Sequence, residues 1–110
     1  MNYKKIFDDL TNELREFSER LEGNKKLRLV GIVDTERAIM NEVNAENHTT
    51  MINKIKISSY KEAIDKVIGS VNYFADTKVI GYNKYKLKQL VDKYEEIKNE
   101  KQAHDKMEVM

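Results

Sequence analysis

Two histidines, His48 and His104, are the side chains best suited to transfer protons or bind metal near neutral pH. His48 lies in a polar stretch, His104 lies near the C-terminus, and no second histidine is within helical reach of either. His104 is followed directly by Asp105, but adjacent side chains on a helix point about 100° apart. We therefore interpret both histidines as exposed residues and predict no catalytic residue and no metal site here.

Two pairs of adjacent carboxylates, Asp8-Asp9 and Glu95-Glu96, are the next candidates for acid–base chemistry. Both pairs lie in segments with helical spacing, where adjacent side chains do not face one another. Such pairs normally belong to a solvated outer face. The chain also has no cysteine, which excludes disulfides, thiolate catalysis and cysteine-ligated zinc or iron–sulfur sites.

Glycines and serines are not arranged for catalysis either. A phosphate-binding loop needs clustered glycines, but the four glycines of this chain are scattered singly. No serine has the sequence context of a nucleophile with its base and orienting group. We therefore predict that the protein is not an enzyme, and we expect no cofactor. The isolated glycines are Gly23, Gly31, Gly69 and Gly81.

A basic segment, residues 78–93, is the first of two features that indicate a binding surface. Lys84 and Lys88 share one face of a helix, and Tyr82 and Tyr85 lie beside them. Lysines can neutralise phosphates and tyrosines can stack on bases, so nucleic-acid binding is one interpretation. Only one arginine, Arg37, follows position 28, and arginine is the usual reader of phosphate and guanine. A solvated basic face is the commoner explanation of such a segment.

Tyrosines near the junction of the last two expected helices are the second feature. Tyrosine is enriched at protein interfaces because its ring is large and loses little conformational entropy on binding. We therefore predict a protein-binding surface at this junction, although the rings could instead seal the corner between the two helices. The predicted partner-binding residues are Tyr73, Tyr82, Lys84, Tyr85 and Lys88.

These residues must be positioned by helices, because apolar side chains recur at steps of three and four along most of the chain. The spacing predicts a mainly α fold, a compact bundle of three to four helices. The same spacing in the first helix resembles a coiled-coil seam, so self-association through it is an alternative to core packing. The expected helices cover residues 3–22, 35–46, 59–75 and 84–100. The stripes predict burial of Phe7, Leu10, Leu14, Phe17, Ile64, Val67, Val71, Leu87, Leu90 and Ile97.

Two apolar segments, residues 27–33 and 51–57, remain ambiguous between strand and helix. The first is short and partly β-branched, and the second alternates apolar and polar side chains. A small two-stranded addition to the bundle is therefore the main alternative. The expected helix starts are Thr35 after Asp34, a capping box at Ser59 and an N-cap at Asn83.

Chain length, charge and apolar segment length indicate the domain organisation and the location of the protein. The chain has 110 residues, which suits one domain, with residues 100–110 expected to form a frayed tail. The net charge of +1 is uneven, because residues 54–93 carry nine basic and four acidic side chains. No apolar segment is long enough for a membrane span or a signal-peptide core, so we expect a cytoplasmic protein with no membrane association.

The span from Val71 to Lys93 joins an aromatic helix end, a short apolar turn and a Lys-Tyr-rich amphipathic helix. In this it resembles the immunity proteins of pediocin-like bacteriocins, which are four-helix bundles of similar length that act by binding. The resemblance covers less than a quarter of the chain and needs an offset of one residue. It extends to no motif in residues 1–58, so it assigns no functional residue.

The sequence therefore predicts a non-enzymatic protein-binding module that acts through its helical surface. A small inhibitor, immunity or regulatory protein of a phage or another mobile element would have these features. The expected partner is another protein. The alternative is a nucleic-acid-binding protein that uses the Lys/Tyr region 78–93.

Overall fold

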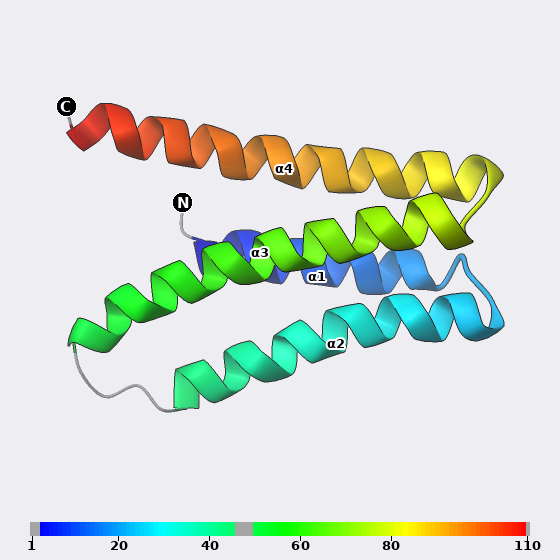
Figure 1. Ribbon diagram of the computed structural model, residues 1–110, viewed down its shortest axis with the longest axis horizontal. Helices are drawn as coiled ribbons and strands as arrows, with labels where there is room; N and C mark the ends of the chain where they lie inside the picture. The colour runs from blue at the N-terminus through cyan, green and yellow to red at the C-terminus, as the bar shows by residue number, and fades with distance from the viewer. Residues whose placement is uncertain (1–2, 46–49, 110) are drawn as a thin grey trace.

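The computed structural model describes residues 3–45 and 50–109, with side chains described for 3–43 and 59–100. It contains four helices, α1 (Tyr3–Ser18), α2 (Gly23–Ala45), α3 (Thr50–Lys78) and α4 (Gly81–Val109) (Figure 1). No strand occurs within the described ranges. The predicted mainly α bundle is therefore confirmed. Residues 27–33 and 51–57 are helical, so the two-stranded alternative is not found.

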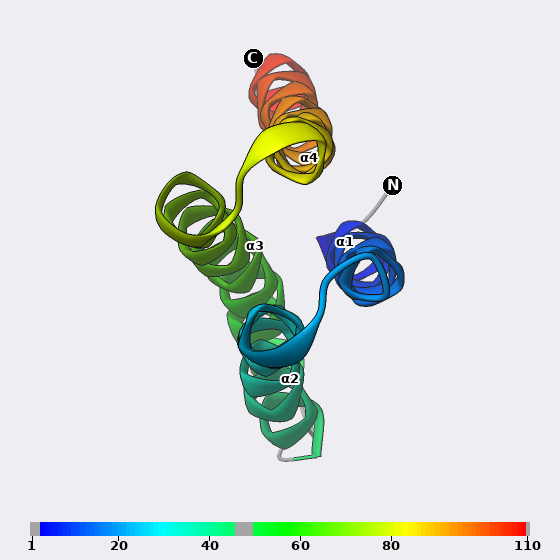
Figure 2. The same cartoon turned by 90° about the vertical axis from the view of Figure 1, so that its right-hand side faces the viewer.

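Helices α1 and α3 form the centre of the bundle. Each of them packs against both α2 and α4, whereas α2 and α4 make no contact with one another in the described part of the chain. The view along the bundle shows this arrangement, with α2 and α4 at opposite edges (Figure 2). The result is a flattened molecule that measures 44 × 32 × 19 Å. Helices α2 and α4 therefore each keep a broad outer face that no other helix covers.

The turn between α1 and α2 differs from the prediction. Helix α1 ends at Ser18 rather than near residue 22, because the amides of the next three residues donate to carbonyls three positions back. Gly23, with φ of +59°, then opens α2, and only glycine adopts this conformation without strain. Asp34 and Thr35 lie inside α2, so the predicted helix start at Thr35 is wrong.

The last two helices also begin earlier than expected. Helix α3 begins at Thr50, so Ser59 lies inside the helix and the predicted capping box is wrong. Helix α4 begins at Gly81, with φ of +66°, rather than after Asn83. Val79 and Ile80 form the connection between α3 and α4, which is shorter than the apolar turn over residues 79–82 that the sequence predicts. Helix α4 continues to Val109, and the fraying expected for residues 100–110 stays a prediction.

The core is formed by the predicted stripes. Of the ten residues expected inside, eight are buried, and Leu90 and Ile97 are partly buried against the same cluster. The α1 stripe lies wholly in this core, so pairing of two copies through it would require the bundle to open. Its members are Tyr3, Phe7, Leu10, Leu14, Phe17 and Leu21.

Candidate protein-binding surface

Two short turns, α1–α2 and α3–α4, lie side by side at one end of the bundle and face the viewer in Figure 2. We call residues 19–28 and 76–88, which make up these turns and the adjoining helix ends, the turn end. Four of the five predicted partner-binding residues belong to it. The fifth, Tyr73, lies in the last two turns of α3.

All three predicted tyrosines are exposed. The exposed fractions are 67% for Tyr73, 64% for Tyr82 and 58% for Tyr85. On α4 the two tyrosines are three residues apart and lie on the face opposite the buried Leu87 and Val91. The rings therefore do not seal the corner between α3 and α4, which was the alternative to a binding surface.

The two predicted lysines behave differently from one another. The ammonium of Lys88 lies 3.2 Å from the Asp76 carboxylate and so connects α4 to α3. Lys84 is partly exposed and forms no ion pair within the described part of the chain. Between them, the Lys86 ammonium lies 5.4 Å from the centre of the Tyr82 ring. Lys88 thus has a structural partner, whereas Lys84 is available to a ligand.

Two aliphatic side chains of the turn end were missed by the sequence analysis. Leu27 is 69% exposed and Ile80 is 79% exposed. Leu27 belongs to the apolar segment 27–33, and as part of α2 it faces away from the buried Leu29 and Val33. Ile80 follows the buried Val79 in a two-residue connection, where only one of two adjacent side chains can point inward.

A pocket of about 490 Å³ lies between the two turns. Leu21 and Val79, both buried, supply apolar surface inside it, and Ile80 lies beside them. The rim is polar and includes Arg20 and Lys25. We call this the turn-end pocket. The full lining is Arg20, Leu21, Glu22, Asn24, Lys25, Val79, Ile80 and Asn83.

The turn end is strongly basic. Residues 19–28 carry four basic and two acidic side chains, and residues 76–88 carry four basic and one acidic side chain, which leaves a net charge of +5. Two of the three acids are already paired, Glu19 with Lys26 at 3.1 Å and Asp76 with Lys88. Glu22 is the third acid, so the basic surplus faces solvent.

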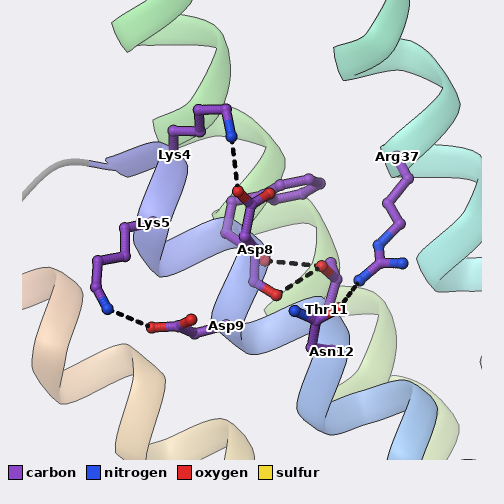
Figure 3. A network of polar contacts seen from close by, with 8 residues as sticks. Lys4, Lys5, Asp8, Asp9, Thr11, Asn12 and Arg37 are labelled. Carbon is purple, nitrogen blue, oxygen red and sulfur yellow. Dashed lines mark hydrogen bonds and ion pairs between the residues drawn. The ribbon is translucent and has the colours of Figure 1, made fainter.

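The adjacent carboxylates Asp8 and Asp9 do not converge on one point. Asp8 and Asp9 point apart, and each pairs with the lysine one turn earlier, Lys4 at 2.8 Å and Lys5 at 3.4 Å (Figure 3). Among the described side chains, no group of three or more His, Asp and Glu residues could hold a metal ion. His48 lies outside the described residues, as does the side chain of His104, so the predictions for them stay predictions.

One further polar cluster joins α1 to α4. The Glu13 carboxylate lies 3.0 Å from the Lys93 ammonium, and the Tyr94 hydroxyl is close enough to interact with it electrostatically. Burial acts to raise the pKa of Glu13, but these two partners outweigh it and the pKa is lowered. Burial, together with the nearby Glu13 carboxylate, raises the pKa of Tyr94. Both shifts follow from burial and from the interactions among these three side chains.

Comparison with known protein families, with curated protein sequences and with solved structures gives no match to this chain. The resemblance of residues 71–93 to bacteriocin immunity proteins therefore gains no support. Within the described ranges, no helix combines the length and the apolar character needed to cross a lipid bilayer.

Proposed function

We propose that the protein is a non-enzymatic protein-binding module whose contact surface is the turn end together with Tyr73. One observation carries this proposal: five large apolar side chains are exposed in this part of a small molecule. Large apolar side chains that are exposed in one region of a protein, among polar groups, are typical of interaction sites. The five residues are Leu27, Tyr73, Ile80, Tyr82 and Tyr85.

The chemistry of these side chains suits association with another protein. Removing a large apolar side chain from water stabilises a complex by about 1.5–3 kcal/mol, and aromatic residues dominate the energetics of many interfaces. The tyrosines also offer hydroxyl groups at the rim. A small inhibitor, immunity or regulatory protein acts by this kind of surface binding, and we place this chain in that class. We also propose a cytoplasmic location and an origin in a phage or another mobile element.

The test compares two double variants in pull-downs from the lysate of the source cell. Tyr82→Ser with Tyr85→Ser removes the two exposed rings of α4. Ile39→Ser with Ala38→Ser changes an exposed patch in the second half of α2 and is the matched control. We expect a partner that the wild type and the control retain and the tyrosine variant loses. Equal recovery by all three proteins would contradict the proposal.

A second candidate function, nucleic-acid binding through residues 78–93, is favoured by the unpaired basic groups of the turn end. Its test is a gel-shift series with a DNA duplex and an RNA oligomer at increasing salt. Replacing Lys84 and Lys88 by alanine should then lower the affinity and flatten the dependence on salt, because fewer counterions are released. No shift at low salt would contradict this candidate.

A further inference from the structure

We infer that the turn-end pocket receives an apolar side chain from an acidic segment of a partner protein. This inference rests on the proposed function and names the partner's chemistry. The pocket, the aliphatic side chains around it and the surplus of positive charge each restrict what can bind there.

The shape of the pocket fits an inserted side chain. Its volume of about 490 Å³ lies within the range of pockets that bind small molecules. Leu21 and Val79 line the pocket but are buried in the core cluster, so they are held in place by the fold. Ile80 is largely exposed and supplies most of the apolar surface of the lining. An apolar anchor would therefore pack mainly against Ile80, without rearrangement of the bundle.

The walls of the pocket are set before any partner arrives. On one side, the amides of Arg20 and Leu21 donate to the carbonyls of Phe17 and Ser18 at 2.9 and 3.0 Å. The Arg20 guanidinium also lies 5.7 Å from the centre of the Phe17 ring. On the other side, the Val79 amide donates to the Ala75 carbonyl at 3.4 Å. A site that is already ordered loses little conformational entropy on binding.

The charge around the pocket selects acidic neighbours of the anchor. Arg20 and Lys25 are exposed at the rim, and neither forms an ion pair among the described residues. Lys84 follows the lining residue Asn83, and Lys78 precedes Val79 on the other side. Carboxylates that flank an inserted apolar group would meet this surplus, which accelerates association and fixes orientation.

One feature favours an acidic protein segment over a nucleic acid. The apolar residues of the pocket lining, Leu21, Val79 and Ile80, are aliphatic, and the lining holds no aromatic ring on which a base could stack. A second copy of the chain cannot dock through its own turn end, because both surfaces carry the same charge.

The direct test uses synthetic peptides as probes. One carries a single phenylalanine flanked by glutamates, a second replaces the phenylalanine by alanine, and a third replaces the glutamates by lysines. Binding is followed by amide chemical shifts and by fluorescence anisotropy at two salt concentrations. We expect only the first peptide to bind, with shifts at residues 20–25 and 79–83 and weaker binding at high salt.

Two charge-matched variants locate the binding. Ile80→Glu should lower the affinity for the first peptide at least about tenfold. Ile39→Glu changes an exposed aliphatic residue in the second half of α2 and should leave the affinity unchanged. Both side chains are exposed, so both variants should fold, which circular dichroism checks.

Several results would overturn the inference. They are failure of the first peptide to bind up to about 1 mM, equal binding of the alanine peptide, and preference for a DNA or RNA oligomer. Concentration-dependent self-association that Ile80→Glu abolishes would identify a second copy instead. If a pulled-down partner is lost by the tyrosine variant but retained by Ile80→Glu, the inference fails while the proposed function stands. Retention by both variants contradicts the proposed function.

Discussion

The body of the bundle and the turn end use charged side chains in opposite ways. In the body, charges join helices: Lys93 pairs with Glu13 of α1, and Lys98 of α4 pairs with Asp65 of α3. At the turn end most basic side chains have no such partner. Arg28 and Lys78, for example, are exposed and form no ion pair within the described residues.

Apolar side chains follow the same division. In the body most of them are buried, with Ile39 exposed, whereas the turn end exposes Leu27, Ile80, Tyr82 and Tyr85 beside its buried Leu21 and Val79. The comparison teaches that most of the exposed large apolar side chains lie apart from the central part of the core. Exposed ion pairs contribute only about 0–1 kcal/mol each, so stability depends mainly on the core. The exposed side chains of the turn end can therefore change with little effect on folding.

The largest expected effect is a difference in unfolding free energy between a variant of the body and a variant of the turn end. Leu14 is fully buried, so Leu14→Ala should lower the free energy of unfolding by about 3 kcal/mol through lost contacts and a residual cavity. Ile80→Ala should change the same quantity by less than about 0.5 kcal/mol, because Ile80 is largely exposed. Urea denaturation followed by circular dichroism measures both. Similar losses of unfolding free energy in the two variants would contradict the division between the body and the turn end.

The glycines give the next largest effect. Gly81→Ala at the turn end should lower the free energy of unfolding by about 1 kcal/mol, because its φ of +66° strains an L-residue. Gly31→Ala, inside α2 with nothing within 4 Å of the added carbon, should raise it by about 0.7 kcal/mol. Thermal and urea unfolding of the two variants check the opposite signs. A gain in stability from Gly81→Ala would show that the turn is not fixed by this residue.

How much of the fold could be predicted from the sequence differs between the helices. The α1 stripe could be predicted because its six apolar residues follow steps of three and four, and all six are buried. The pattern of helix α2 could not be predicted, because the helix exposes the apolar Leu27 and Ile39, which blurs the apolar stripe. Its start was missed because the turn at Gly23 needs only four residues between helices.

The candidate surface was predictable in its aromatic part only. Tyr82 and Tyr85 could be placed outside because they lie opposite the stripe of Leu87. The pocket could not be predicted, since it forms where two turns far apart in sequence meet. The pairing of Lys88 with Asp76 also joins separate helices, and no local pattern indicates it.

A smaller difference in stability is expected between two ion-paired carboxylates, one in the body and one at the turn end. Asp65 pairs with Lys98, whose side chain is almost fully buried, so Asp65→Asn should lower the free energy of unfolding by about 1 kcal/mol. Asp76 pairs with the more exposed Lys88, so Asp76→Asn should cost less than about 0.5 kcal/mol. Urea denaturation at low and high salt measures both. An equal or larger loss for Asp76→Asn would show that the turn end also holds the fold together.

The smallest effect is a dependence of stability on pH that comes from Glu13 and Tyr94 in the body. The pKa of Glu13 is lowered in the fold, so the stabilisation it provides is present at neutral pH and is lost as pH falls through that lowered pKa. The pKa of Tyr94 is raised, so its stabilisation is lost as pH rises above the value of an unfolded tyrosine, about 10.

Tyr94→Phe tests this dependence, because it keeps the ring in the core and removes the hydroxyl. The free energy of unfolding of the variant should differ most from the wild type between about pH 5 and 9, and the two curves should converge on both sides. Glu13→Gln should reproduce the acidic part of the convergence, because it removes the carboxylate charge that interacts with Tyr94 and Lys93. Parallel curves for Tyr94→Phe and the wild type across the whole range would show that this cluster does not link α1 to α4 energetically. The body would then depend on apolar packing alone, and the contrast with the turn end would concern burial rather than charge.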